Sequence, residues 1–194
     1  MCGRFLLDSS IDDLKNYYNI TNEVRYKRGE LFPSDTSIIV DNSGFKSLSW
    51  GFPGKDKLLI NGRCETIFER PMFSASMESR RCLIPANRFL EWKDGVKYSI
   101  GIEASEIFSF GGIVKRFILK DGTVADRYLL LTTEASDNMK NIHHRMPLIL
   151  DRTLEREFLN PWTAKEDIKA MLRPYDKGKL SIISLNETMQ LSFL

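Results

Sequence analysis

The stretch RCLIPANRFLEWKDGVKYSIGI (residues 81–102) contains two β-type runs, RFLEWK and KYSIGI, that are separated by the turn signal KDG. Alternating or continuous apolar runs bounded by Gly and Asp are typical of strands joined by tight turns. Similar runs recur along the chain: TSIIVD (36–41), SLSWGF (47–52), IFSFGGIV (107–114), YLLLTT (128–133), PLILD (147–151) and SIISL (181–185).

Helical patterns are fewer than strand patterns. DSSIDDLKNYYNI (8–20) places Ile11, Leu14, Tyr17 and Tyr18 at helical spacing, with Asp8 or Ser9 as the expected N-cap. Further helical patches are expected at ASDNMKNI (135–142), TLEREFLN (153–160) and TAKEDIKAML (163–172). Because strands and helices do not alternate regularly, we predict an α+β fold with a mostly antiparallel, barrel-like β-sheet flanked by a few helices.

Length and composition favour one globular domain over residues 1–194. The chain is 42% hydrophobic and 28% charged, with a formal net charge of +2, which is ordinary for a folded domain and too mild to indicate a nucleic-acid partner. No apolar run approaches the ~20 residues that span a bilayer, and no signal peptide is recognisable. Three cysteines do not form a disulfide framework, so we expect a cytoplasmic protein without a membrane partner.

Cys2 directly follows the initiator methionine. If Met1 is removed, Cys2 carries a free α-amine with a reference pKa of about 7.7–8.0, against about 10.4 for lysine, so far more of it is unprotonated at neutral pH. The amine can condense with an aldehyde to an imine, and the thiol, whose pKa Arg4 could lower, can then close a five-membered thiazolidine. The alternative is that Cys2 is simply a small buried residue near the chain end.

NGRCET (61–66) combines an amide, a guanidinium and a carboxylate at alternate positions. On an extended segment Asn61, Arg63 and Glu65 would share one face, and Arg63 could bind a phosphate through paired hydrogen bonds. The alternative is a solvated strand face with an internal Arg63–Glu65 ion pair. Cys64 is interpreted as a core residue, as is Cys82.

Glu91 and the histidines are the candidate acid–base groups. Glu91 lies between Leu90 and Trp92, and partial desolvation would raise its pKa and fit it for proton transfer, unless it is an ordinary outward-facing residue. His143 and His144 are the only histidines. Neighbours on an extended chain point in opposite directions, so at most one is expected beside Arg145. The spacing does not favour a zinc site, so we expect no metal.

Taken together, MCGRF (1–5), NGRCET (61–66), RCLIPANRFLEW (81–92) and NIHHRMPLIL (141–150) resemble, in this order and spacing, the SOS response-associated peptidase (SRAP) family. These proteins shield abasic sites in single-stranded DNA. The resemblance runs from Cys2 to at least Leu150. It departs from the family at several flanking positions: Arg88 and Leu90 replace residues usual there, and the segment WGFPGKDKLLINGR (50–63) lacks a usual tryptophan.

The resemblance implies a mechanism in which Met1 is removed and Cys2 captures the ring-opened sugar of an abasic site as a covalent thiazolidine crosslink. Asn61 would orient the adduct, Glu91 would act as general acid and base, and His143 would help open the sugar. Arg4, Arg63 and Arg145 match positions that hold the DNA backbone.

The expected partner is therefore single-stranded DNA with an abasic site. We expect a monomer without a small-molecule cofactor, associated with the nucleoid when bound to DNA. Two alternatives stay open: a cysteine peptidase that uses Cys2 mainly on its own N-terminus, and a binding module for single-stranded DNA that forms no covalent bond.

Overall fold

Five strands close into a barrel in the computed structural model, which describes residues 2–176 and 178–185. Around the barrel β12 pairs with β4, β4 with β3, β3 with β8, β8 with β11, and β11 again with β12. All of these pairings are antiparallel except β12 with β4, where Arg127 and Tyr128 lie beside Ser49 and Trp50. The predicted α+β class with a mostly antiparallel, barrel-like sheet is confirmed.

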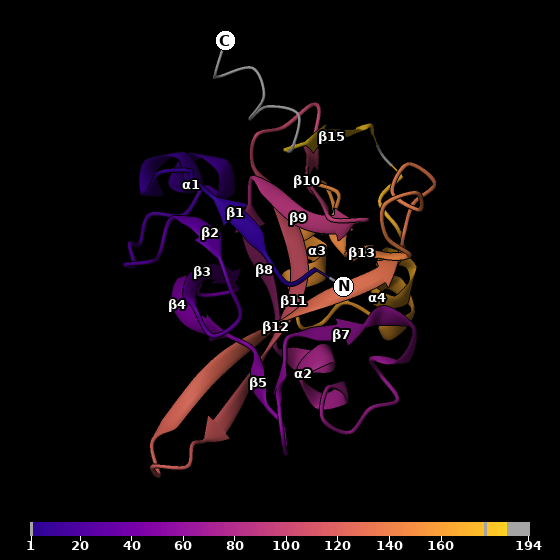
Figure 1. Ribbon diagram of the computed structural model, residues 1–194. Coiled ribbons are helices and arrows are strands. Elements are labelled where there is room, and N and C mark those ends of the chain that lie inside the picture. The colour runs from indigo at the N-terminus through magenta and orange to yellow at the C-terminus, as the bar shows by residue number, and fades with distance from the viewer. Residues whose placement is uncertain (1, 177, 186–194) are drawn as a thin grey trace.

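The bounds of the elements are as follows (Figure 1). The strands are β1 Phe5–Leu7, β2 Gly29–Leu31, β3 Thr36–Asp41, β4 Gly44–Trp50, β5 Phe52–Pro53, β6 Leu58–Leu59, β7 Asn61–Arg63, β8 Arg81–Ala86, β9 Arg88–Lys93, β10 Val96–Ile102, β11 Phe108–Ile118, β12 Val124–Glu134, β13 Arg145–Pro147, β14 Ile149–Leu150 and β15 Leu180–Ser184. The helices are α1 Ile11–Tyr18, α2 Ser74–Ser79, α3 Glu155–Leu159 and α4 Lys165–Met171, with a 3-10 turn η1 at Cys64–Thr66.

A second sheet has the order β15-β10-β9-β1-β2 and carries the start of the chain. The predicted hairpin of β9 and β10 is confirmed: Asp94 and Gly95 form its turn with φ of 51° and 81°, the left-handed conformations that a tight hairpin turn requires. β1 lies antiparallel to β9, with Phe5 opposite Phe89. The first residues of the chain are therefore held against the strand that contains Glu91.

Aromatic packing joins the two sheets. The ring of Phe5 in β1 contacts Trp50 and Phe110 of the barrel at centroid distances of 5.4 and 5.8 Å, and all three side chains are fully buried. The Trp50 indole donates a hydrogen bond to the carbonyl oxygen of Ile60 at 2.9 Å, just before β7. This packing fixes β1 and β7 relative to one another, because close-packed cores leave little room for sliding.

Helix α1 begins later than the predicted caps. Ser10 is the N-cap: its side chain accepts from the backbone of Asp13, and the Asp13 carboxylate accepts in return from the Ser10 backbone. The backbone amides of Asp8 and Ser9 donate instead to the side chain of Asn87, at 2.6 and 3.2 Å. A long-range partner thus occupies the residues that local sequence favoured as caps.

The other helical predictions have mixed outcomes. Helices α3 and α4 form within 153–160 and 163–172, as predicted. The helix predicted at 135–142 is wrong. This segment forms a run of turns with backbone hydrogen bonds such as Met139 N to Ser136 O at 2.8 Å. Helix α2 was not predicted. No helix in the described residues has the length and apolar character needed to cross a membrane.

Candidate active site

Cys2 is positioned by β9 on one side and by β7 on the other. The amide of Leu90 donates to the carbonyl oxygen of Arg4 at 3.0 Å, continuing the β1–β9 pairing toward the chain start. The Asn61 side-chain amide donates to the carbonyl oxygen of Cys2 at 2.9 Å. Figure 1 shows the indigo start of the chain passing close to β7 and β9. The structure therefore brings Cys2, Asn61 and the Glu91 strand together.

The Cys2 thiol is fully buried and uncharged. Its sulfur donates to the carbonyl oxygen of Arg4 at 3.3 Å. Burial, with a smaller contribution from the negative charge of Glu91, raises the pKa of the Cys2 thiol far above its usual range. Arg4 opposes this rise only through its backbone carbonyl, which is too little to lower the pKa below the usual range; its guanidinium binds Glu30 instead, at 3.2 Å.

Glu91 is buried rather than outward-facing. Phe89, Leu90 and Glu91 are successive buried residues of β9, and exposure returns only at Trp92. The alternation expected for a half-exposed strand fails because other elements cover both faces of β9 at this point. Burial raises the pKa of the Glu91 carboxyl above its ordinary value.

Asn61 reaches this position from β7, which lies parallel to β12 with Asn61 beside Leu130. Its side-chain oxygen is buried and makes no hydrogen bond to the described residues. An unpaired buried acceptor is costly, and a catalytic role is one of the explanations for such a group in a native protein. The Asn61 nitrogen therefore donates to Cys2, while its oxygen can still accept a hydrogen bond.

The predicted extension of NGRCET as one strand is wrong beyond Arg63. The 3-10 turn η1 begins at Cys64, so Glu65 does not share a strand face with Asn61 and Arg63. The Glu65 carboxylate instead accepts hydrogen bonds from both terminal nitrogens of Arg145, at 2.7 and 3.0 Å. Partial burial opposes ionisation of Glu65, but the hydrogen bonds from Arg145 outweigh it and leave the pKa of Glu65 below its ordinary value.

The three predicted DNA-binding arginines differ in accessibility. Arg63 is exposed and Arg4 is partly exposed. The Arg145 side chain is only 7% exposed, and it also donates to the carbonyl oxygen of Thr132 at 2.7 Å. Its role toward DNA stays a prediction, and a phosphate would have to compete with Glu65 for it.

His143 and His144 do not point in opposite directions. Their rings stack with centroids 4.4 Å apart and an interplanar angle of 23°. The expectation is wrong because the chain bends here and becomes extended only at Arg145, where β13 begins. Burial lowers the pKa of His143 and, with the charge of His143, that of His144.

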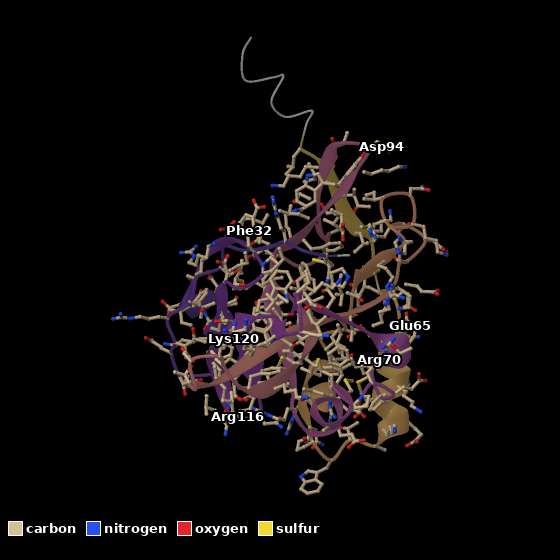
Figure 2. All side chains as sticks on the ribbon, turned by 60° about the horizontal axis from the view of Figure 1, so that its bottom comes forward. Phe32, Glu65, Arg70, Asp94, Arg116 and Lys120 are labelled. Atoms are coloured by element: carbon tan, nitrogen blue, oxygen red, sulfur yellow. The ribbon has the colours of Figure 1, made fainter. Side chains whose placement is uncertain are left out.

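Two aromatic side chains that sequence reasoning passed over flank Arg4. The guanidinium lies over the ring of Phe32 at 4.6 Å and over that of Trp92 at 4.9 Å. Phe32 is 38% exposed and Trp92 is 40% exposed, and Figure 2 shows Phe32 at the surface. Exposed rings beside a cation suit nucleic-acid bases. Phe32 precedes a proline in the apolar run LFP, which is the only signal that could have pointed to it.

Metal ligation finds no support in the described part of the chain, where no group of three or more His, Cys, Asp or Glu side chains is placed to hold an ion. A buried thiol, an amide, a buried carboxyl and a histidine together suit the addition of a nucleophile to a carbonyl.

The fold itself is that of known α+β barrel proteins. A protein from Bacteroides thetaiotaomicron superimposes with a TM-score of 0.86 at 23% identity, over 97% of this chain and 94% of that chain. A second protein, from Bordetella bronchiseptica, superimposes with a TM-score of 0.82 at 19% identity, over 95% of this chain and 99% of that chain. These likenesses define the class of fold.

The chain belongs to the SOS response associated peptidase (SRAP) family, whose model matches residues 1–190. Among its relatives, the abasic site processing protein YoaM of Bacillus subtilis (strain 168) is 34% identical, over 91% of this chain and 87% of that protein. The abasic site processing protein YoqW of Bacillus phage SPbeta is also 34% identical, over 91% of this chain and 88% of that protein. The predicted family is confirmed.

Proposed function

We propose that this protein recognises abasic sites in single-stranded DNA and captures them covalently through Cys2 once Met1 has been removed. Met1 lies outside the described residues. The observation that carries the proposal is the hydrogen bond from Asn61 to the Cys2 carbonyl, beside the buried carboxyl of Glu91. This contact supports a role for Asn61 in orienting Cys2, and Glu91 on the strand that pairs with β1 is a group that can move protons. The names of the bacterial and phage relatives support abasic DNA as the substrate.

The chemistry balances without a further reactant. The neutral Cys2 amine adds to the aldehyde of the ring-opened sugar, and loss of one water gives an imine. The thiol sulfur then bonds to the imine carbon while its proton moves to the nitrogen, which closes a thiazolidine. The product is the sum of protein and DNA less one water. No electron acceptor or donor is needed.

Two side chains carry out the proton transfers, and a third orients Cys2. Glu91, whose pKa burial raises, can hold a proton near neutrality and give it to the departing hydroxyl during imine formation. His143 is the group proposed to assist ring opening, because a neutral imidazole can accept the sugar hydroxyl proton. Asn61 holds the Cys2 carbonyl and so restricts the direction of attack.

Arg63 and Arg4 are the accessible cations for the DNA backbone. An arginine that binds a phosphate releases a counterion from the DNA, so the affinity falls as the salt concentration rises. The exposed rings of Phe32 and Trp92 beside Arg4 offer surfaces for base stacking, each worth about 1–3 kcal/mol per base. The strand would thus approach Cys2 along a face with both charge and aromatic surface.

The state of the thiol argues against general cysteine proteolysis. A peptidase nucleophile is a thiolate, and burial raises the pKa of Cys2 so that the thiol stays neutral. Thiazolidine formation begins with the amine and needs the thiol only after the imine has formed. Cleavage of the chain's own first peptide bond would be a single turnover and is compatible with the same site.

Intact-mass spectrometry tests the proposal. Protein beginning at Cys2 is incubated with single-stranded DNA that has one abasic site, and the expected mass is the sum of the two less one water. Cys2→Ser should leave an imine that heating reverses, and Cys2→Ala should leave no heat-stable adduct. Cys82→Ala is the matched control, since Cys82 is a buried thiol in β8. An unchanged heat-stable adduct in Cys2→Ala contradicts the proposal, and binding without any mass change favours a non-covalent module.

A further inference from the structure

The stacked pair of histidines has one inner and one outer ring. His144 is exposed, whereas His143 is partly buried, and the rings face each other with centroids 4.4 Å apart. One face of the His143 ring is therefore covered by His144 instead of by water. The proposed mechanism uses His143 and leaves His144 without a role.

The inner ring is held by the backbone of Arg145. The amide N–H of Arg145 points at Nδ1 of His143 over 2.9 Å, and the carbonyl oxygen of Arg145 lies 3.1 Å from the same nitrogen. A backbone N–H can only donate, so neutral His143 accepts at Nδ1 and carries its proton on Nε2. Protonation at Nδ1 would exchange this hydrogen bond for one to the carbonyl oxygen of Arg145, but burial outweighs that gain and lowers the pKa of His143.

Charged groups surround the outer ring. Besides burial, the positive charges of His143, Arg145 and Arg63 lower its pKa. The charge of His144 in turn makes a small contribution that lowers the pKa of the Glu91 carboxyl in β9. Two stacked imidazoles cannot both be charged without repulsion, so a proton on one ring disfavours a proton on the other.

We propose that His144 is a positioning residue of the site: its ring fixes the plane of His143 and, by taking the first proton of the pair, keeps His143 neutral and able to accept a proton. The exposed ring takes that proton because water solvates its charge, whereas partial burial disfavours a charge on His143. This inference rests on the proposed function only for the use of His143; the coupling of the two rings is a property of the free protein.

Two substitutions separate stacking from charge. His144→Phe keeps an aromatic ring against His143 without a charge, and His144→Ala removes both. In either variant His143 is the single histidine of the chain, so its imidazole signals can be titrated by NMR without overlap. Two unit charges at this separation interact weakly in water, and we expect the proton affinity of His143 to rise about fivefold in both variants.

The crosslinking assay then tests position. Between pH 8 and pH 5.5 the rate should fall more steeply in His144→Phe than in the natural protein, because His143 charges at higher pH. The crosslinking rate of His144→Ala at pH 8 should be lower than that of His144→Phe, because the alanine variant has no ring that holds the His143 ring in place. Lys140→Ala, which removes a cation of the preceding turns, should move neither the NMR midpoint nor the rates.

An unchanged His143 midpoint in His144→Phe overturns the coupling, and equal rates for the Phe and Ala variants at pH 8 overturn the positioning. The NMR titration needs no DNA. A protein that shows the shift but forms no crosslink therefore contradicts the proposed function and leaves the coupling standing.

Discussion

The side-chain amide of Asn61 donates a hydrogen bond of 2.9 Å to the carbonyl oxygen of Cys2, although 59 positions separate the two residues in the chain. The bond fixes the start of the chain, which in most proteins frays. It also connects two sheets: Asn61 lies in β7, which pairs with β12 of the barrel, and Cys2 precedes β1 of the second sheet.

Asn61→Ala removes the hydrogen bond and leaves the Cys2 carbonyl without this donor. A net contribution of about 1 kcal/mol to the correct orientation predicts a crosslinking rate about fivefold to tenfold lower, measured by gel shift at saturating abasic DNA. Asn22→Ala is the control, because Asn22 also bonds to a backbone, at Phe45, but away from Cys2. Equal rates in the two variants would show that the bond is only structural.

Glu91→Gln removes the proposed proton donor while preserving shape. The crosslinking rate should fall by about 100-fold, the usual scale for loss of a general acid or base. Single-turnover kinetics at pH 7 measure this, and Glu103→Gln, at an exposed position, serves as control. A rate within twofold of the natural protein would remove Glu91 from the mechanism.

The same substitution should also change how the stability of the fold depends on pH. Because burial raises the folded-state pKa of Glu91, the folded protein binds this proton more tightly than the unfolded chain does. Stability from this group is present below the unfolded pKa and is lost as pH rises through the folded pKa. Glu91→Gln should therefore be less sensitive to the rise from acid to neutral pH than the natural protein, as thermal unfolding at several pH values can measure.

Glu65→Gln breaks the charged pair with Arg145. The Arg145 side chain is 7% exposed and that of Glu65 is 44% exposed, so the remaining guanidinium loses its counter-charge while water compensates only in part. We expect a loss of about 2 kcal/mol in the free energy of unfolding, below the cost of breaking a fully buried pair. Urea denaturation measures the loss. Glu69→Gln is the exposed control from the same segment, and a similar loss in both variants would contradict a specific role for the pair.

Arg63→Ala and Arg4→Ala should each weaken binding to single-stranded DNA and reduce the slope of log affinity against log salt by about 0.7. Fluorescence anisotropy at several salt concentrations gives the slope. Arg116→Ala is the control: Figure 2 shows Arg116 on the long β11–β12 hairpin, well separated from Glu65 and the turn that follows Arg63. If all three variants change the slope alike, binding is spread over the surface and is not centred on Cys2.

Two sources of sequence information differed in what they could predict. Short-range patterns located most strands, because alternation and turn residues act within a few positions. They misplaced the start of α1, where the distant side chain of Asn87 captures the amides of Asp8 and Ser9. The four motifs, taken in order, pointed to the family and to Asn61, whose side chain the fold brings to the Cys2 carbonyl.

By itself the sequence determined the β9–β10 hairpin, the helices α3 and α4, and the presence of a cysteine at position 2 with an amide, a carboxyl and a histidine available elsewhere in the chain. Only the tertiary structure decided that Glu91 is buried, that Glu65 binds Arg145 instead of Arg63, and that the two histidine rings stack. The physical reason is that burial and ion pairing depend on which distant segments cover a residue. Closure of the barrel and the docking of β1 on β9 set those neighbours, and no local pattern encodes them.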